Sequence, residues 1–370
     1  MDKSVRNDLA AKYLTIRQRM TKVLFILKRR EDFTAKKHSH IGLSTGLFNS
    51  ASFVNIMLNQ LGVESNLEVA IDNNDIDRLV TQYKPDYVII EALWVVPSKF
   101  AILQRLHPKV QWIIRLHSEL PFMAGEGMAM DWLGDYSEFK TITIAANAPR
   151  MLSDIKTYLR YKNGWSNSEL ADKVVYLPNF YPQRYVLKDF DREKDTVDIG
   201  CFGAVRLLKN HLVQAFAAIQ FAEDLGKKLR FHINAGRIEM QGEPVLNNLK
   251  GTFQHLTKAD HQLINHQWTP RDEFLKLCAT MDIGMQCNFS ETFNIVGADL
   301  ISQGVPLVGC SEIPWAMPGF YADPNSVVDI TKKLHLAYKH PCMNVILNQL
   351  SLTAYTNRVG AIWTKYFKGN

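Results

Sequence analysis

The chain has 370 residues, of which 46% are hydrophobic and 22% charged, with a formal net charge of +6 and a mean hydropathy of −0.14. This composition is ordinary for a globular protein and excludes a disordered or fibrous one, and the length predicts two domains. The apolar runs are too short for a membrane-spanning helix, and the charged N-terminus lacks a signal-peptide pattern, so we expect a cytoplasmic protein.

The positive charge gathers at the start of the chain. Residues 1–40 hold 11 Lys or Arg against 4 Asp or Glu, whereas the remaining residues sum to −1. Apolar positions between Lys3 and Arg19 follow a helical period, which predicts a basic amphipathic helix. Such a helix is either simply solvated or faces a polyanion, which would be nucleic acid or anionic lipid.

Short apolar runs alternate with helical patterns through the first half of the chain. Runs that are apolar on both faces are typical of buried parallel strands, and their alternation with helices is typical of a doubly wound α/β domain. The expected strands are Val23–Leu27, Tyr87–Ile90, Trp112–Ile114 and Thr141–Ala145, and the expected helices include Ser52–Leu61 and Ile76–Tyr83.

A charged stretch that contains Pro182 interrupts this alternation, which restarts at Asp198. We therefore predict an N-terminal Rossmann-like domain (1–180), a linker (181–197), a second Rossmann-like domain (198–345) and a C-terminal helix (346–370) that could cross back to the first domain. The predicted fold class is α/β, with two doubly wound domains facing across a cleft. Ligands bind at the carboxyl ends of the strands in such sheets.

Two segments of the second domain carry charged side chains suited to a sugar nucleotide. Gly203, Arg206 and Lys209 lie between a strand and a helix start, where cations and backbone N–H groups favour a diphosphate, although such cations are more often only solvated. Glu291 and Asp299 lie eight residues apart, two helical turns on one side of a helix that starts early. Carboxylates at these positions can bind sugar hydroxyls, or they can be a capping acid and an exposed helical acid.

Residues 290–309 resemble the E-x7-E region of the retaining, nucleotide-sugar-dependent glycosyltransferases of the GT-B superfamily (glycosyltransferase family 4-like). Gly203, Arg206 and Lys209 resemble its donor-phosphate element in the same order. Val175–Asn179 resembles its interdomain signature, 113–118 its strand ending in a histidine near the sugar, and 266–271 its segment beside the nucleotide base.

The resemblance implies a role for each matching residue. Arg206 and Lys209 would neutralise the diphosphate of a UDP- or GDP-sugar. His117 and Glu291 would be the catalytic residues: Glu291 would hold the hydroxyls of the transferred sugar, and His117 would touch the sugar ring or lower the barrier by hydrogen bonding. The other implied donor contacts are ribose hydroxyls for Asp299, the base for Trp268, and loop backbone for Gly46, Phe293, Asn294 and Ile295. No cofactor or metal is implied, and configuration is retained by attack from the same face.

Three features depart from this family pattern or compete with it. Asp299 is one methylene shorter than the usual Glu, and Asn294 replaces a usual glycine, so we expect a differently shaped loop. Asp75 and Asp77 spell D-x-D, which binds a metal in another glycosyltransferase class, but their position before a helix favours capping.

On the acceptor side, Lys28, Arg29, Arg30 and Lys37 would lie near the cleft with Trp94, unless they are solvated loop charges and Trp94 is packed against a helix. Cations beside an aromatic suit a phosphate backbone with a stackable base. Residues 37–51 are also similar to glycosyltransferases of tailed bacteriophages, some of which glycosylate hydroxymethylated pyrimidines in viral DNA after base flipping. That similarity implies a DNA acceptor and location in the host cytoplasm.

Other functions stay open at this point. One is transfer to a surface glycan or lipid-linked sugar, with the N-terminal helix in peripheral contact with a membrane. A nucleotide-sugar epimerase or a non-catalytic nucleotide-sugar binder are further alternatives.

Overall fold

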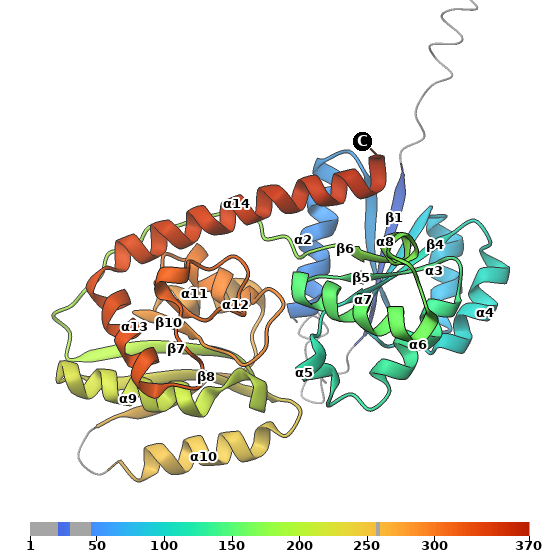
Figure 1. The fold of residues 1–370 in the computed structure, drawn as a ribbon. Coiled ribbons are helices and arrows are strands. Elements are labelled where there is room, and N and C mark those ends of the chain that lie inside the picture. Colours follow the sequence, from blue (N-terminus) through green and yellow to red (C-terminus); the bar gives the residue numbers. More distant parts are fainter. Residues whose placement is uncertain (1–20, 30–45, 257–259, 370) are drawn as a thin grey trace, which may run out of the picture.

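The computed structural model describes residues 21–29, 46–256 and 260–369. The helix predicted between Lys3 and Arg19 lies outside these residues, as do Arg30 and Lys37. Two α/β domains lie side by side, and a long helix runs along both of them (Figure 1). In the described part of the chain, no helix is both long and apolar enough to cross a membrane.

The first domain is built on a six-stranded parallel sheet in the order β2-β1-β3-β4-β5-β6. Its strands are β1 (Lys22–Lys28), β2 (Glu64–Ala70), β3 (Tyr87–Glu91), β4 (Gln111–Leu116), β5 (Ile142–Ala146) and β6 (Val174–Tyr176). The connecting helices are α2 (Gly46–Gln60), α3 (Asp75–Tyr83), α4 (Pro97–Leu106), α5 (Leu120–Met123), α6 (Ala129–Glu138), α7 (Pro149–Asn163) and α8 (Asn167–Lys173).

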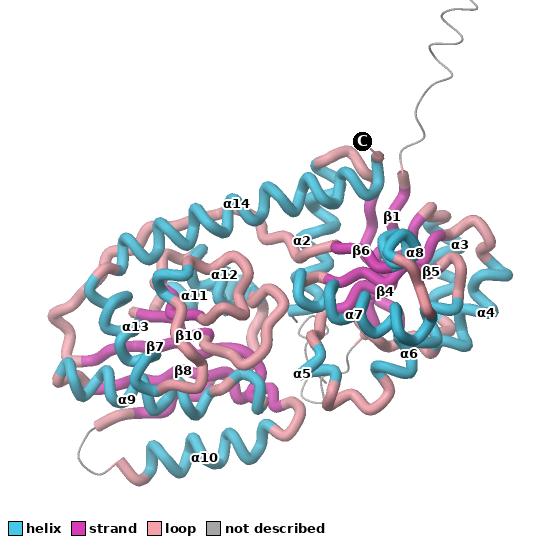
Figure 2. The backbone as a smooth tube through the Cα atoms, in the orientation of Figure 1, coloured by secondary structure: helices cyan, strands magenta, loops and turns pink. Residues whose placement is uncertain are grey.

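The second domain repeats this plan with a five-stranded parallel sheet in the order β11-β10-β7-β8-β9. The strands β10, β7 and β8 lie side by side in Figure 2. Its strands are β7 (Thr196–Val205), β8 (Lys228–Ile238), β9 (Gln262–Asn265), β10 (Ile283–Gln286) and β11 (Leu307–Gly309). Its helices are α9 (His211–Leu225), α10 (Gly242–Gln254), α11 (Arg271–Ala279), α12 (Ile295–Ser302) and α13 (Val327–Lys339), with short 3-10 turns at η2 (Leu207–Lys209) and η3 (Pro318–Phe320).

Alternate side chains of each strand enter different hydrophobic cores. Val23, Phe25 and Leu27 of β1 face one side of the sheet, whereas Leu24 and Ile26 face the other, as the period of two in a strand requires. The core on the Phe25 side continues into the second domain and includes buried residues of α12 and the last helix. The two domains therefore share one core and also have one each of their own.

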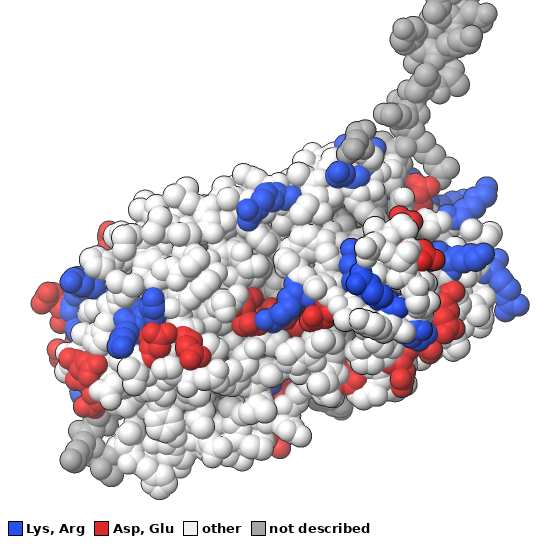
Figure 3. Space-filling view, viewed as in Figure 1, with Lys and Arg blue, Asp and Glu red and all other residues white. Residues whose placement is uncertain are grey.

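The segment between the two sheets is partly buried against the two domains. Tyr181 is 1% exposed and belongs to the shared core, and β7 already begins at Thr196, within the predicted linker. The last helix, α14 (Pro341–Lys368), begins five residues before the predicted boundary and ends against β1, where the hydroxyl of Thr21 donates to the carbonyl of Phe367. The surface along α14 carries few charges (Figure 3), because Arg358, Lys365 and Lys368 are its only charged residues.

Two strands of the structure, β2 and β9, are not predicted from the sequence. The residues of β2, ESNLEVA, are half-buried up to the final alanine, because this edge strand pairs with β1 alone. The strand β9 is also at an edge and has four residues. Edge strands lack the long apolar run by which a central parallel strand is recognised in a sequence.

Candidate functional site

A cleft of about 1200 Å³ lies between the two domains, at the carboxyl ends of their strands. Every predicted site residue that the structure describes lines this cleft. They are His117, Glu291, Arg206, Lys209, Gly203, Trp268, Phe293, Asn294, Ile295, Asp299, Gly46, Lys28, Arg29 and Trp94. Sequence positions that are far apart therefore meet at one place.

Glu91 and Arg115 form a buried ion pair at the first-domain wall of the cleft. They are partners in the register of β3 and β4, and Nη1 of Arg115 lies 3.0 Å from Oε1 of Glu91. Both side chains are fully buried, and Arg115 also donates to the carbonyl of Leu177 at 3.0 Å. Burial alone would raise the pKa of Glu91, but Arg115 and His117 outweigh it, so this pKa is lowered and the carboxylate is ionised.

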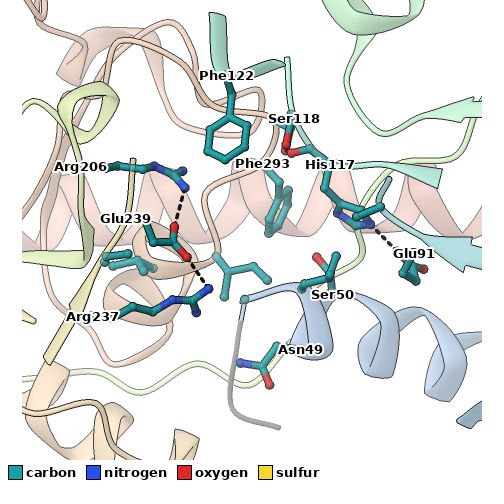
Figure 4. Close-up of a pocket in the computed structure, with 18 of the residues that line it drawn as sticks. Asn49, Ser50, Glu91, His117, Ser118, Phe122, Arg206, Arg237, Glu239 and Phe293 are labelled. Carbon is teal, nitrogen blue, oxygen red and sulfur yellow. Dashed lines mark hydrogen bonds and ion pairs between the residues drawn. The ribbon is translucent and has the colours of Figure 1, made fainter. Parts of the chain in front are cut away.

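His117 follows β4 and is held by its neighbours at both ring nitrogens. Its Nε2 contacts the carboxylate of Glu91 (Figure 4), and its Nδ1 lies 3.2 Å from Nδ2 of Asn147. Because an ionised carboxylate only accepts hydrogen bonds, Nε2 carries the proton and Nδ1 accepts from the amide. Burial, opposed by Glu91, lowers the pKa of His117, so a neutral imidazole of fixed tautomer faces the cleft.

Lys209 and Glu291 are paired on the second-domain wall. The ammonium of Lys209, at the end of η2, contacts the carboxylate of Glu291, which also accepts a 2.8 Å hydrogen bond from Asn288. The helix does not start early enough to place Glu291 and Asp299 along one side of it, because α12 begins at Ile295. Glu291 stands in the preceding loop, and this places its carboxylate beside Lys209.

Arg206 lies at the end of β7 and contacts both domains. Its Nη1 is 3.1 Å from Oε2 of Glu239, and its guanidinium lies 4.7 Å from the ring centre of Phe122 in the first domain. Gly203, three residues earlier, has a φ of 119°, a conformation that other residues rarely adopt. Gly203 lies within β7, where the register with β8 shifts between Gly200 and Ala204, and a Cβ there would lie 3.6 Å from Cε of Lys209.

Asn294 occupies the left-handed backbone conformation, with φ 65° and ψ 80°. Glycine adopts this region most readily and asparagine tolerates it better than most residues, so asparagine does not by itself require a different loop backbone. Its side chain caps α12 by accepting a 2.7 Å hydrogen bond from the backbone N–H of Gly297. Phe293 is turned into the shared core, while Ile295 is half-buried at the cleft.

Asp299 is committed to partners inside the protein. Its Oδ1 lies 2.7 Å from Nη2 of Arg271 and accepts a 2.7 Å hydrogen bond from the hydroxyl of Tyr181. The side chain is 3% exposed, and burial, opposed by Arg271, raises the pKa of its carboxyl. Asp299 therefore connects the interdomain segment to α11 and α12, a role that the sequence did not indicate; the implied ribose contact stays a prediction.

Arg237, Glu239 and Arg271 also line the cleft and are not among the predicted site residues. Arg237 binds Glu239 and lies 5.1 Å from the ring centre of Trp268. The strand β8 continues past its buried residues to Ile238 and carries Arg237 to the cleft. A pattern of hydrophobicity alone could not show this extension, because its last residues are partly exposed.

The predicted acceptor residues lie across the first-domain side of the cleft. Lys28 and Arg29 are exposed at the carboxyl end of β1, and Gly46 begins α2. Trp94 lines the cleft and also packs against the first-domain core. It is therefore both near the cleft and packed on its own domain, the two positions considered for it from the sequence.

Asp75 and Asp77 are engaged in ion pairs away from this cleft. Asp75 binds Arg78 at 2.6 Å and Asp77 binds His107 at 2.8 Å. The helix α3 has Asn74 at its N-cap, so Asp75 stands in the first turn instead of capping it. Among the described residues, no group of three His, Cys, Asp or Glu is arranged to hold a metal ion.

The sequence matches no protein-family model and no curated protein. The fold resembles that of an α,α-trehalose-phosphate synthase (UDP-forming) from Burkholderia vietnamiensis, with a TM-score of 0.65, 11% identity, and coverage of 94% of this chain and 96% of that one. A sucrose-phosphate synthase from Thermosynechococcus elongatus gives a TM-score of 0.66 at 11% identity, covering 94% and 98% of the two chains. A glycosyltransferase from Rickettsia africae gives 0.58 at 11% identity, covering 95% and 98%.

The similarity extends over nearly the whole of each chain, so both domains and their arrangement are shared. The predicted fold class is confirmed: the chain has the GT-B fold, with two Rossmann-like domains facing across a cleft.

Proposed function

We propose that the protein is a retaining glycosyltransferase that moves a sugar from a nucleotide-sugar donor to a hydroxyl acceptor. The observation that carries the proposal is the meeting of Arg206, Lys209 and Glu291 in the interdomain cleft of a GT-B fold. The names of the similar structures, a UDP-forming synthase among them, support the same activity.

In the proposed reaction the acceptor oxygen bonds to the anomeric carbon of the sugar as the bond from that carbon to the diphosphate breaks. The electron pair of the broken bond stays on the diphosphate, and the hydroxyl proton passes to a phosphate oxygen. Arg206 and Lys209 would stabilise the negative charge that develops on the diphosphate. Such electrostatic stabilisation of the transition state is the largest single contribution to catalysis in many enzymes. Glu291 would hold the sugar hydroxyls, and the fixed His117 would face the sugar ring.

The two cations take the place that a metal ion has in other sugar transfers, so we propose that no metal is required. UDP-sugars and GDP-sugars are the donors to test. Transfer that is abolished by a chelator and restored by manganese would contradict this part of the proposal. The anomeric configuration of the product, read by NMR, tests retention.

For the acceptor we propose a 5-hydroxymethyl pyrimidine in DNA, as in the phage enzymes that residues 37–51 resemble. Lys28 and Arg29, exposed at the mouth of the cleft with Trp94 nearby, support a phosphate backbone and a stacked base. A small sugar or glycan is the second candidate, because two of the similar structures are named as synthases of sugar phosphates.

The deciding experiment incubates the protein with nucleotide sugars and duplex DNA that contains hydroxymethylcytosine, beside unmodified DNA. Nucleoside mass spectrometry should show the gain of one sugar on the modified nucleoside alone. Slow donor hydrolysis without this gain would support a glycosyltransferase with another acceptor, such as a glycan or lipid-linked sugar. Conversion of the donor without transfer would indicate an epimerase, and binding without turnover a non-catalytic protein.

A further inference from the structure

Two arginines face one carboxylate on the second-domain wall of the cleft. Oε2 of Glu239 is 3.1 Å from Nη1 of Arg206, and Oε1 of the same carboxylate contacts Nη2 of Arg237. The close-up shows the carboxylate between the two guanidiniums (Figure 4). All three side chains are between 20% and 24% exposed and line the cleft, so a soluble anion can reach them.

The parallel sheet brings these residues together. Val205 of β7 is paired with Ile238 of β8, so the next residues, Arg206 and Glu239, leave the sheet side by side. The backbone N–H of Glu239 donates to the carbonyl of Val205 at 3.0 Å. The spacing between Arg206 and Glu239 is thus set by backbone hydrogen bonds and not by the two side chains alone.

Each guanidinium is also oriented by an aromatic ring. Arg206 lies over Phe122 and Arg237 over Trp268, with 4.7 Å and 5.1 Å from the guanidinium carbon to the ring centre. A cation–π contact at this distance restrains the arginine, while its in-plane N–H groups can still bind a carboxylate or a phosphate. Arg206 and Arg237 therefore form an anion-binding site, and in this structure the anion in the site is the carboxylate of Glu239.

We propose that Arg237 is a further donor-binding residue, and that Glu239 competes with the donor's diphosphate for Arg206 and Arg237. This inference rests on the proposed function, in which Arg206 contacts that diphosphate. Binding of donor exchanges the Glu239 carboxylate for phosphate oxygens, and departure of the nucleoside diphosphate is assisted when Glu239 returns.

The charges of the site support an exchange. Lys209 is paired with a carboxylate of its own, Glu291, so Arg206, Arg237 and Lys209 each face an acid. A diphosphate would otherwise be bound by three cations with no competing acid, and its release would be slow. An internal carboxylate lowers the affinity for substrate and product alike, because the same N–H donors must be shared.

The test is calorimetric titration of the full chain with inorganic pyrophosphate, UDP and GDP. Glu239→Gln keeps the size of the side chain and removes its charge, and Arg237→Gln removes the second guanidinium. Glu193→Gln, at an exposed acid of the interdomain segment that does not line the cleft, changes the net charge by the same amount and is the control.

We expect Glu239→Gln to bind pyrophosphate and at least one nucleoside diphosphate about fivefold or more tightly than the wild type does. Arg237→Gln should bind the same ligands about fivefold or more weakly. The affinity of the control variant should be unchanged. Circular dichroism establishes that each variant is folded, and Arg237→Lys, which retains the charge, should recover part of the loss.

Unchanged or weaker pyrophosphate binding by Glu239→Gln would overturn the proposal. Weaker UDP or GDP binding with unchanged pyrophosphate binding would also overturn it, since Glu239 would then bind the nucleoside. If Arg206→Gln weakens diphosphate binding while the Glu239 and Arg237 variants do not change it, this inference fails and the proposed function stands. If the wild type binds no diphosphate at all, both fail.

Discussion

The carboxylate of Glu291 is bound to the ammonium of Lys209, 82 positions earlier in the chain. The pair joins the loop before α12 to the turn after β7; in the proposed function Glu291 binds the sugar and Lys209 its phosphates. If Glu291 orients the sugar, its substitution lowers the turnover number. If Glu291 competes with the diphosphate for Lys209, its substitution raises the affinity for the diphosphate.

Glu291→Gln should therefore separate these two effects. We expect the turnover number to fall by about 100-fold or more, because the contact to the sugar in the transition state is weakened. Affinity for the nucleoside diphosphate should be kept or increased, because Lys209 is released from its acid. Steady-state kinetics and calorimetry measure the two quantities, with the exposed Glu193→Gln as control; full turnover by Glu291→Gln would show that this residue does not hold the sugar.

His211 should make the protein sensitive to acid. This first residue of α9 is 1% exposed, and burial, together with Lys209 and Arg206, lowers its pKa to about 3. In the unfolded chain the pKa is near 6.5, so below that pH the unfolded state binds a proton that the folded state does not, and stability falls as the pH falls. From pH 7 to pH 5 this residue alone should lower the free energy of unfolding by about 2 kcal/mol.

His211→Leu should lose that part of the pH dependence, since leucine has no proton to bind. Urea denaturation at pH 7 and pH 5 measures the difference, and the exposed His255→Gln serves as the comparison. An unchanged slope in His211→Leu would mean that other groups cause the loss of stability.

Gly242 should be the least replaceable glycine of α10. A Cβ atom there would lie 2.0 Å from the carbonyl oxygen of Val205, a backbone atom next to Arg206. Gly242→Ala must displace the helix or the strand end, so we expect a loss of about 2 kcal/mol or more in the free energy of unfolding and weaker diphosphate binding. Gly251→Ala in the same helix has open space and should stabilise the protein by about 0.5–1 kcal/mol.

Trp363 should contribute to the stability of the whole molecule. Its ring is fully buried in the shared core 5.3 Å from the Arg115 guanidinium, and its Nε1 donates a 2.9 Å hydrogen bond to the carbonyl of Pro178. We expect Trp363→Ala to cost about 3–5 kcal/mol, as for other large core aromatics, and to lower the melting temperature markedly. Leu350 in the same helix is 62% exposed, so Leu350→Ala should change the free energy of unfolding by less than about 0.5 kcal/mol.

The central strands and the residues proposed to bind the donor could be located because each set is local in the sequence. The apolar run of β1 and the order Gly203, Arg206 and Lys209 both lie within ten residues. The strand β2 was missed for the opposite reason, since its edge position leaves its polar residues half-exposed.

The pairings inside the site could not be predicted in the same way. Glu91 meets His117 only because β3 and β4 are neighbours in the sheet, and Asp299 meets Tyr181 across 118 positions. Residue types at these positions can be read from the sequence, but their partners cannot, so the buried pairing of Asp299 with Arg271 and Tyr181 was not predicted. Arg237 and Glu239 depend in addition on how far β8 extends.

The helix α14 also limits how the cleft can change width. Its 28 residues make a rod of about 42 Å, which is packed on the second domain at one end and on the first sheet at the other. Because the helix is held at both ends, the domains cannot simply move apart along its length. Any opening of the cleft has to occur by rotation about α14 or by bending it.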